Sequence, residues 1–289
     1  MSAALLTRPR ADWRGGTVLM ALLAPILLVN VLTFLAPVIN LAMLSFRGSG
    51  PGGSIQEGLT TATWTSLLTD SFYWEILLGT VWTSLLITFL TLLCSYPVAL
   101  WVSRLGARWR NLMMVVCISP LLVSAVVRTY GWMILLGDQG FVPGVIRAMG
   151  MTPPRLLFNE TGVIIGLTEI LMPYMILSLL AGFGKLDRTL EDAAGTLGAR
   201  PFTVFRRIVL PLSLPGLLLG CLLTFVLAVS SFITPKLLGG GRVVLLATEI
   251  YDQAIVTLNW PLASALSILV LVVFGAALAV YGQLSKLVD

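Results

Sequence analysis

Long apolar runs alternate with short polar connections along most of this chain of 289 residues. The hydrocarbon core of a bilayer is about 30 Å thick and an α-helix rises about 1.5 Å per residue, so a crossing needs about 20 mostly apolar residues. Six stretches meet this requirement, at residues 17–43, 76–102, 111–136, 161–183, 209–235 and 261–285. The pattern predicts an all-α membrane protein that forms a single domain, 1–289, with six transmembrane helices.

The composition supports a membrane location and excludes several classes of protein. Charged residues make up 11% of the chain, whereas a soluble domain carries about 25%. The net charge of +5 does not indicate nucleic-acid binding, because the basic residues lie between apolar runs and form no continuous stripe. The chain has no histidine, which excludes His-based catalysis and a His-ligated metal. Cys94, Cys117 and Cys221 fall inside apolar runs and are interpreted as small buried residues.

Basic residues are concentrated in alternate connections, and this asymmetry predicts the orientation. They precede the first stretch, separate the second from the third, and separate the fourth from the fifth: Arg8, Arg10, Arg14, Arg104, Arg108, Arg110, Lys185, Arg188, Arg200, Arg206 and Arg207. Loops rich in Lys and Arg stay in the cytoplasm. Both termini and the loop over residues 184–208 are therefore expected to be cytoplasmic.

The connection between the fourth and fifth stretches is long and strongly patterned. Five apolar residues recur in it at helical spacings of three and four: Leu186, Leu190, Ala193, Ala194 and Leu197. Asp187 suits the N-cap of such a helix, and Gly198 can end it in a left-handed conformation. Pro201 suits the first turn of a second helical segment. We therefore expect a short helix across the cytoplasmic mouth, with an apolar stripe available to a partner.

Asp192-Ala193-Ala194, followed by Gly198 and by Ile208-x-Leu210-Pro211, resembles the EAA loop of permeases in ATP-binding-cassette importers. The resemblance implies that residues 185–211 carry a coupling helix that sits in a groove on a separate ATPase. The residues implied in this contact are Leu190, Glu191, Asp192, Ala193, Ala194, Leu197, Gly198, Ile208, Leu210 and Pro211. Asp192 stands where the family usually has Glu; either Glu191 takes over its contact or the shorter acid suffices. The alternative interpretation is an ordinary amphipathic helix at the membrane surface.

Further motifs resemble permeases of the spermidine/putrescine importer subfamily. They are Arg128-Thr129-Tyr130-Gly131-Trp132, Met172-Pro173-Tyr174, Lys185-Leu186-Asp187 and Asn259-Trp260-Pro261. The resemblance implies the type I importer permease fold in a bacterial inner membrane and transport of a small organic solute, such as putrescine or spermidine. Relatives in the subfamily also carry opines, phosphonates and ferric iron, and these substrates are kept as alternatives.

The resemblance also implies partners and an energy source. A second, similar permease would complete a heterodimer, two copies of an ATPase would dock on the cytoplasmic side, and a periplasmic binding protein would deliver the substrate. Transport would proceed by alternating access. The chain itself has no G-x-x-x-x-G-K-[ST] phosphate loop, so we expect it to bind no cofactor and to catalyse no reaction, with Mg-ATP held by the partner ATPase.

Glu169 and Arg128 are ionisable residues within predicted spans. Such a residue costs several kcal/mol unless it is paired, protonated or facing a cavity. Glu169 lies eight residues from the outer end of its stretch, about 12 Å at about 1.5 Å per residue, and Arg128 lies at a similar depth. Two interpretations are open: Glu169 attracts a cationic substrate, or the two residues form a structural ion pair.

Other residues in the spans carry weaker signals. The aromatic side chains of Tyr130, Trp132 and Tyr174 could face an organic cation, or they pack between helices and at the interface. The hydroxyls of Ser230, Ser231 and Thr234 could line a gate, or bond to backbone carbonyls. Three local features have structural consequences. Gly216 and Gly220 suit close helix contact, Pro97, Pro120, Pro173 and Pro235 suit kinks or breaks, and Val243–Val256 suits a surface helix with Glu249 and Asp252 on its wetter side.

Three functions compete with that of an importer. One of them, a permease-like exporter or sensor, is disfavoured because the resemblance to the EAA loop implies an importer. An intramembrane protease needs a Ser/His set, paired aspartates or an HExxH motif, and the sequence provides no histidine and only one acid in a span, Glu169. An ion-coupled secondary carrier would work without an ATPase and would not need the patterned loop over residues 185–211. Uptake that persists after deletion of the ATPase would favour the carrier.

Overall fold

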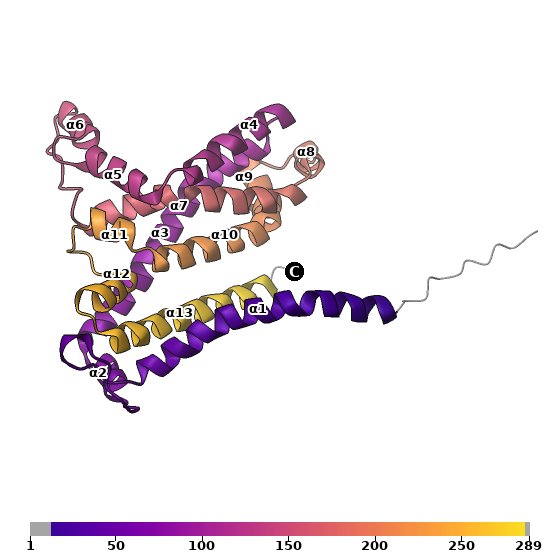
Figure 1. Ribbon diagram of the computed structural model, residues 1–289. Helices are drawn as coiled ribbons and strands as arrows, with labels where there is room; N and C mark the ends of the chain where they lie inside the picture. The colour runs from indigo at the N-terminus through magenta and orange to yellow at the C-terminus, as the bar shows by residue number, and fades with distance from the viewer. Residues whose placement is uncertain (1–12, 287–289) are drawn as a thin grey trace, which may run out of the picture.

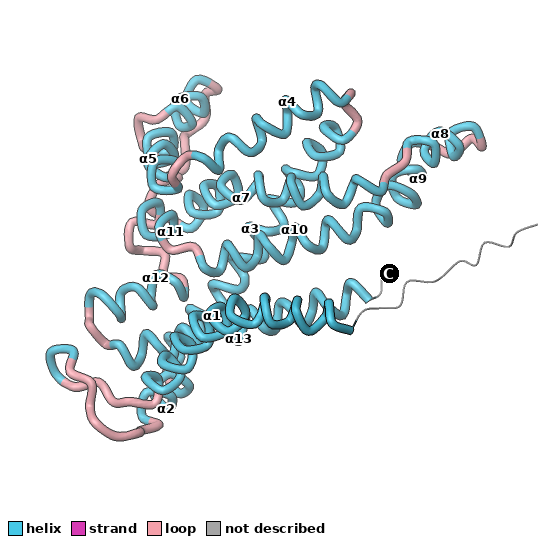
Figure 2. The backbone as a smooth tube through the Cα atoms, turned by 45° about the vertical axis from the view of Figure 1, so that its right-hand side comes forward, coloured by secondary structure: helices cyan, strands magenta, loops and turns pink. Residues whose placement is uncertain are grey.

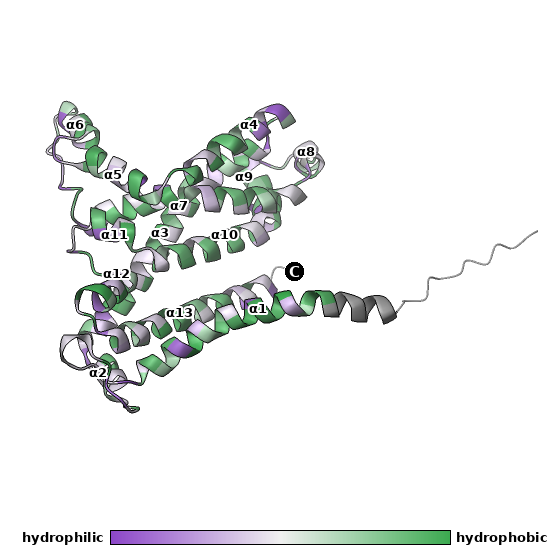
Figure 3. Ribbon diagram, viewed as in Figure 1, coloured by the Kyte–Doolittle hydropathy of each residue, from purple (hydrophilic) through white to green (hydrophobic). Residues whose placement is uncertain are grey.

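The computed structural model describes residues 13–286, and within that range every named element is a helix (Figure 1). Five helical segments of this range are long and apolar enough to cross a membrane, and a sixth is added if one bent pair counts as a single span. The segments are Leu22–Ser45, Ser71–Ser103, Glu160–Gly182, Pro201–Ser230 and Trp260–Lys286. They correspond to five of the six predicted stretches, and most of their residues are hydrophobic (Figure 3). Arg8 and Arg10, which entered the orientation prediction, lie outside the described residues.

The elements follow one another along the chain with short connections. The longer helices are α1 (Trp13–Ser45), α3 (Ser71–Ser103), α7 (Glu160–Gly182), α10 (Leu210–Ser230) and α13 (Trp260–Lys286). The shorter helices are α2 (Ala62–Thr69), α4 (Ala107–Ile118), α5 (Ala125–Leu136), α6 (Phe141–Ala148), α8 (Arg188–Thr196), α9 (Pro201–Val204), α11 (Ile233–Leu238) and α12 (Leu246–Tyr251). Single turns of 3₁₀-helix are η1 (Pro51–Gly53), η2 (Ser119–Leu122) and η3 (Phe183–Lys185), and π-helical segments are η4 (Phe205–Val209) and η5 (Asp252–Val256).

Helices α3, α7 and α10 pack against one another to form the centre of the bundle. The buried face of α3 carries small hydroxyl side chains: Thr80, Thr83, Ser84, Thr88, Thr91 and Ser95. Small residues let helix backbones approach closely in a membrane. The closest approach joins α7 and α10, where a Cβ atom built on Gly216 would lie 2.6 Å from the Cα of Gly182. The expectation that Gly216 and Gly220 lie at a tight helix contact is confirmed.

Helices α1 and α13 lie side by side and form an arm apart from α7 (Figures 1 and 2). None of the most apolar window of α1 is buried within the chain. A helix that is apolar all round and unburied is suited to lipid or to another membrane helix rather than to water. The arm therefore leaves a long apolar surface outside the central bundle.

The third predicted stretch, residues 111–136, is a broken segment, and the break or kink expected at Pro120 is confirmed. Helices α4 and α5 are separated by η2 and a short extended link, and the two halves of this segment meet at 93°. Pro120 is the physical cause, because it has no N–H to donate and crowds the preceding turn. The carbonyl oxygen of Pro120 accepts a hydrogen bond from the Val123 N–H at 3.1 Å and a second one from Arg128 Nη1 at 3.3 Å, so the backbone at the break is hydrogen-bonded.

The fifth predicted stretch is also divided, since α10 ends at Ser230 and Pro235 lies in the separate helix α11. Pro97 and Pro173, in contrast, lie inside α3 and α7 without ending them. Helix α12 and η5 form the expected short helix, but Glu249 is buried there and accepts a hydrogen bond from Gln253. The prediction that Glu249 lies on the more solvent-exposed side of this helix is therefore wrong. The burial predicted for the three cysteines is also wrong at Cys94, which is exposed.

Candidate functional site

The segment between α7 and α10 forms a small helical projection at one end of the bundle (Figure 2). Asp187 caps α8, because its carboxylate accepts a hydrogen bond from the Thr189 N–H at 3.0 Å. That hydrogen bond holds the pKa of Asp187 below its usual value. Gly198 has φ of +80°, a left-handed conformation that only glycine adopts readily, and Pro201 starts α9. The local geometry predicted for this loop is confirmed at each of these positions.

Apolar side chains of this projection face away from the rest of the chain. Leu197 is 89% exposed and Phe202 is 72% exposed, while Leu190 and Ala193 are also exposed. We call the surface formed by Leu190, Ala193, Leu197 and Phe202 the α8–α9 apolar surface. Large apolar side chains gathered at a polar helix end are suited to contact with another protein.

The other residues predicted for the docking contact divide into two groups. Asp192, Gly198 and Pro211 are exposed, whereas Ala194, Ile208 and Leu210 are half-buried against the projection and the start of α10. Glu191 forms an ion pair with Arg104 at the end of α3, with 2.8 Å between Nη2 and Oε2. Of the two acids, Asp192 is the one that faces outward.

An aromatic cluster joins this projection to the bundle. The Tyr96 ring on α3 packs edge-on against Phe183 and Phe205, at centroid distances of 5.6 and 5.8 Å. The Tyr96 hydroxyl is hydrogen-bonded to the Ser213 hydroxyl at 3.0 Å. Tyr96 was not predicted from the sequence, because its partners lie on separate elements and no local spacing relates them. The cluster connects α9 and η4 to α3 and α7.

Arg128 and Glu169 meet at the break between α4 and α5. Arg128 Nη2 donates to Glu169 Oε1 at 2.9 Å, and Trp132 Nε1 donates to Glu169 Oε2 at 3.0 Å. The Arg128 side chain is 11% exposed and that of Glu169 is 38% exposed. The ion pair that the sequence left as one of two interpretations therefore forms, and one face of the carboxylate is still accessible.

The remaining candidates from the sequence do not gather around Glu169 as one site. Tyr130 and Tyr174 are exposed, on α5 and α7. Thr234 is buried and its hydroxyl is bonded to that of Thr129 at 2.9 Å, which ties α11 to α5. Ser230 donates to the Leu227 carbonyl at 3.2 Å. For Thr234 and Ser230 the geometry is that of helix contacts and backbone hydrogen bonding.

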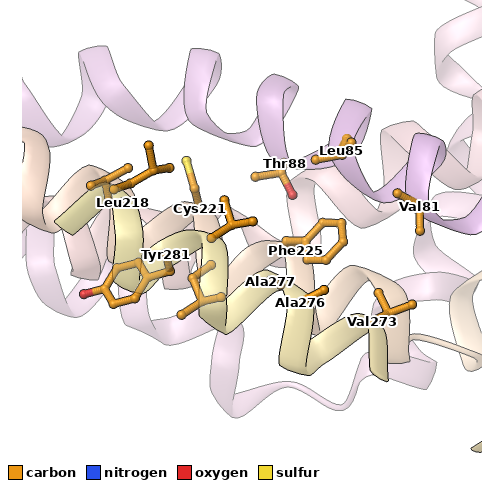
Figure 4. A pocket seen from close by; sticks show the side chains of 13 residues that line it. Val81, Leu85, Thr88, Leu218, Cys221, Phe225, Val273, Ala276, Ala277 and Tyr281 are labelled. Atoms are coloured by element: carbon orange, nitrogen blue, oxygen red, sulfur yellow. The ribbon is translucent and has the colours of Figure 1, made fainter. Parts of the chain in front are cut away.

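An apolar crevice of about 460 Å³ lies between α3, α10 and α13 (Figure 4). Leu85, Phe225 and Ala277 are typical of its walls, and Thr88, Cys221 and Tyr281 contribute its few polar atoms. No charged side chain lines it. The crevice is thus suited to hydrocarbon rather than to a charged solute. Within residues 13–286, no group of three or more Cys, Asp and Glu side chains is placed to hold a metal ion.

Comparison with known proteins gives consistent matches across the chain. Residues 95–288 match the family described as binding-protein-dependent transport system inner membrane component. A relative named spermidine/putrescine transport system permease protein PotB, from Escherichia coli strain K12, is 33% identical over 261 residues, covering 90% of this chain and 94% of the relative. The protein of the same name from Haemophilus influenzae is 37% identical over 215 residues, covering 72% and 75%.

A solved structure shares the fold across nearly the full length. It is a bacterial alginate ABC transporter in complex with an alginate pentasaccharide-bound periplasmic protein, with a TM-score of 0.72, 16% identity and coverage of 97% of this chain and 98% of that chain. At this identity the likeness concerns the fold alone.

Proposed function

This chain belongs to the family of binding-protein-dependent transport system inner membrane components, and from that membership we propose how its surfaces serve transport. It is a multi-pass permease subunit of an importer, with the fold of type I importer permeases. The proposal has two parts: the α8–α9 apolar surface docks on an ATPase, and the solute that crosses is a polyamine.

Docking on an ATPase is supported by the exposure of the α8–α9 apolar surface. Leu197 and Phe202 are more than two-thirds exposed, at the end of α8 and the start of α9, where the rest of the described chain does not cover them. Burial of apolar area stabilises association by about 25 cal/mol per Å² before the entropic cost of binding. The aromatic cluster around Tyr96 connects the segments on either side of α8 to α3, and the ion pair between Glu191 and Arg104 joins α8 itself to the end of α3.

Retention of the ATPase during purification of the assembled transporter tests this part. Gly198→Asp should abolish retention, because it adds a negative charge to the docking surface at a position where a Cβ atom meets nothing within 4 Å and where Asp and Asn tolerate the left-handed φ of +80°. Gly198→Asn is the matched control, since Asn tolerates the left-handed region and is neutral. Membrane insertion of both variants should equal that of the parent. A Gly198→Asp complex that purifies with its ATPase would refute the proposal that the α8–α9 apolar surface docks on the ATPase.

Transport of a polyamine is supported by the two relatives named for spermidine and putrescine. The accessible face of Glu169 adds a chemical argument, because a carboxylate can accept further hydrogen bonds beyond those from Arg128 and Trp132. An ammonium group of a polyamine is a donor of the right charge. Opines, phosphonates and ferric iron are the alternative substrates.

Calorimetry on the binding protein encoded beside this chain, followed by uptake assays in cells, distinguishes these substrates. Putrescine or spermidine should bind the binding protein and be taken up only when the ATPase is present. Tight binding of an opine or of ferric iron, with none of the polyamines, would overturn the substrate assignment but not the permease function. Uptake that continues without the ATPase would refute the proposal that ATP hydrolysis drives transport.

Partner arrangement and orientation complete the proposal. We place both termini and α8 in the cytoplasm, because Arg104, Arg206 and Arg207 lie at the same end of the bundle as α8. A second permease would supply the other wall of the pathway, two ATPases would dock on the pair, and a periplasmic binding protein would deliver solute at the opposite end. A cysteine introduced near Gly198 should react only with membrane-permeable reagents in intact cells.

A further inference from the structure

A charged and aromatic cluster lies at the end of the bundle opposite α8, where α11 meets α12 and η5 (Figure 1). Lys236 Nζ donates to both carboxylate oxygens of Asp252, at 2.5 and 2.6 Å. The same Nζ lies 5.9 Å from the centroid of the Tyr251 ring, and that ring stacks on Phe232 with centroids 5.2 Å apart. One ammonium group is thus held by a carboxylate and an aromatic ring.

These contacts are the ones by which proteins bind the primary ammonium group of an organic amine. A carboxylate accepts its N–H groups, and the face of an aromatic ring attracts its charge. Nothing in either contact is particular to a lysine side chain. The side chains of Lys236 and Asp252 are each about one-third exposed, so a solute has access to the pair.

A pocket of about 410 Å³ adjoins the cluster, between the end of α10, α12 with η5, and α13. Phe232 and Tyr251 form part of its wall, and Ile250, Ile255 and Val270 make most of the remainder apolar. Such a wall accommodates methylene groups. A pocket for hydrocarbon beside a site for ammonium matches the chemistry of an alkyl chain that carries a primary ammonium group.

We propose that Asp252 and Tyr251 form a binding site for the primary ammonium group of an organic amine, that Lys236 fills this site in the present conformation, and that an incoming amine displaces Lys236. The inference rests on the proposed function for the nature of the solute. It adds a site, away from Glu169, where the solute first meets the permease.

Displacement of Lys236 has a structural consequence for α11. This helix is six residues long and follows the break in α10 at Ser231 and Phe232. Lys236 ties it to η5, and the hydroxyl bond between Thr234 and Thr129 ties it to α5. An amine that takes the place of Lys236 releases the first attachment while the second stays. Binding at the entrance is thereby linked to the position of α11.

A purely structural ion pair predicts a different response to mutation, and this difference makes the inference testable. If Lys236 and Asp252 only hold α11 to η5, then removal of either partner breaks the same contact and has the same effect. If Lys236 competes with the amine, Lys236→Met strengthens amine binding, whereas Asp252→Asn weakens it. The two variants are then expected to move the affinity in opposite directions.

The experiment uses the complex of this chain with its partner permease and ATPase in lipid nanodiscs, titrated with 1,4-diaminobutane. Lys236→Met should lower the Kd, and Asp252→Asn should raise it, each by up to about fivefold, the scale set by a partly exposed ion pair. Asp138→Asn, which neutralises an exposed acid between α5 and α6, is the matched control and should leave the Kd unchanged. The neutral analogue 1,4-butanediol should not bind.

Uptake by the same variants separates the two levels of the proposal. One outcome is that the parent takes up the amine while both variants shift the Kd in the same direction or not at all. That outcome would overturn the site and leave the proposed substrate standing. Opposite shifts in Kd without amine uptake would support the site and overturn the proposed substrate. If Asp252→Asn fails to assemble, Tyr251→Leu replaces it, and a Kd unchanged by Lys236→Met overturns the site on its own.

Discussion

The contact between α7 and α10 leads to the sharpest stability prediction for this protein. A Cβ atom on Gly216 would meet the Cα of Gly182 at 2.6 Å and the carbonyl oxygen of Ser178 at 2.7 Å. Ordinary van der Waals contact begins at 3.4 Å, so the Cα approach is about 0.8 Å too short. Both contacts are with backbone atoms, which cannot rotate away as a side chain can. Gly216→Ala therefore requires the two helices to move apart.

The expected cost follows from two opposing effects. Overpacking of a tight contact costs about 1–3 kcal/mol. Replacement of a glycine inside a helix by alanine stabilises the helix by up to about 1 kcal/mol, because alanine has the higher helix propensity. Gly275→Ala on α13 isolates the second effect, because its Cβ would meet nothing within 4 Å. The difference between the two variants should thus equal the overpacking cost, about 1–3 kcal/mol. Gly220→Ala should fall between them, since its shortest contact is with the movable Met175 Sδ.

Thermal unfolding of the purified complex in nanodiscs measures this difference. A domain of this size shifts its Tm by roughly 2–4 °C per kcal/mol, so Gly216→Ala should unfold several degrees below Gly275→Ala. The order expected is Gly216→Ala below Gly220→Ala below Gly275→Ala. Equal Tm values for Gly216→Ala and Gly275→Ala would refute the argument that the backbone contact between α7 and α10 is rigid.

Three further predictions concern charged groups. Glu169→Gln should lower uptake without lowering the amount of assembled complex, because it removes the accessible carboxylate; unchanged uptake kinetics would remove Glu169 from the pathway. Glu191→Gln should reduce ATPase retention by at most about 1 kcal/mol, since it only breaks the surface ion pair with Arg104; complete loss of retention would make Glu191, not Asp192, the acid that contacts the ATPase. The folded pKa of Asp187 is depressed, so its capping contribution is present above its ordinary pKa and is lost as the pH falls through the depressed value. ATPase retention should accordingly fall in acid, and Asp187→Asn should lack that acid-dependent loss; identical pH profiles would contradict the capping role.

Most of the fold could be predicted from the sequence, because a bilayer imposes a length and a polarity on each crossing helix. Five of the six predicted stretches coincide with long apolar helical segments. The third stretch is broken near Pro120, where the sequence indicates a kink or break, but the 93° angle between its two halves depends on packing with other helices. Arg128 on α5 donates to the carbonyl of Pro120 across this break.

The candidate docking loop was predictable in more detail than the candidate pathway. Asp187, Gly198 and Pro201 act through their own backbone or through neighbours two or three residues away, so their roles can be predicted from the local sequence. The partners of Glu169 come from another helix, and depth along a helix left both interpretations of it open. Proximity in three dimensions shows that one oxygen is held by Arg128 and the other by Trp132.

The sequence by itself determined that the chain belongs in a bilayer, where its crossing segments lie, and how the short helix between α7 and α10 begins and ends. These properties follow from apolar length and from hydrogen bonds between near neighbours. Tertiary structure decided which charges meet, as with Lys236 and Asp252, and which glycines touch, as with Gly182 and Gly216. Such contacts depend on how whole helices pack, and packing is set by the shapes of several helices at once.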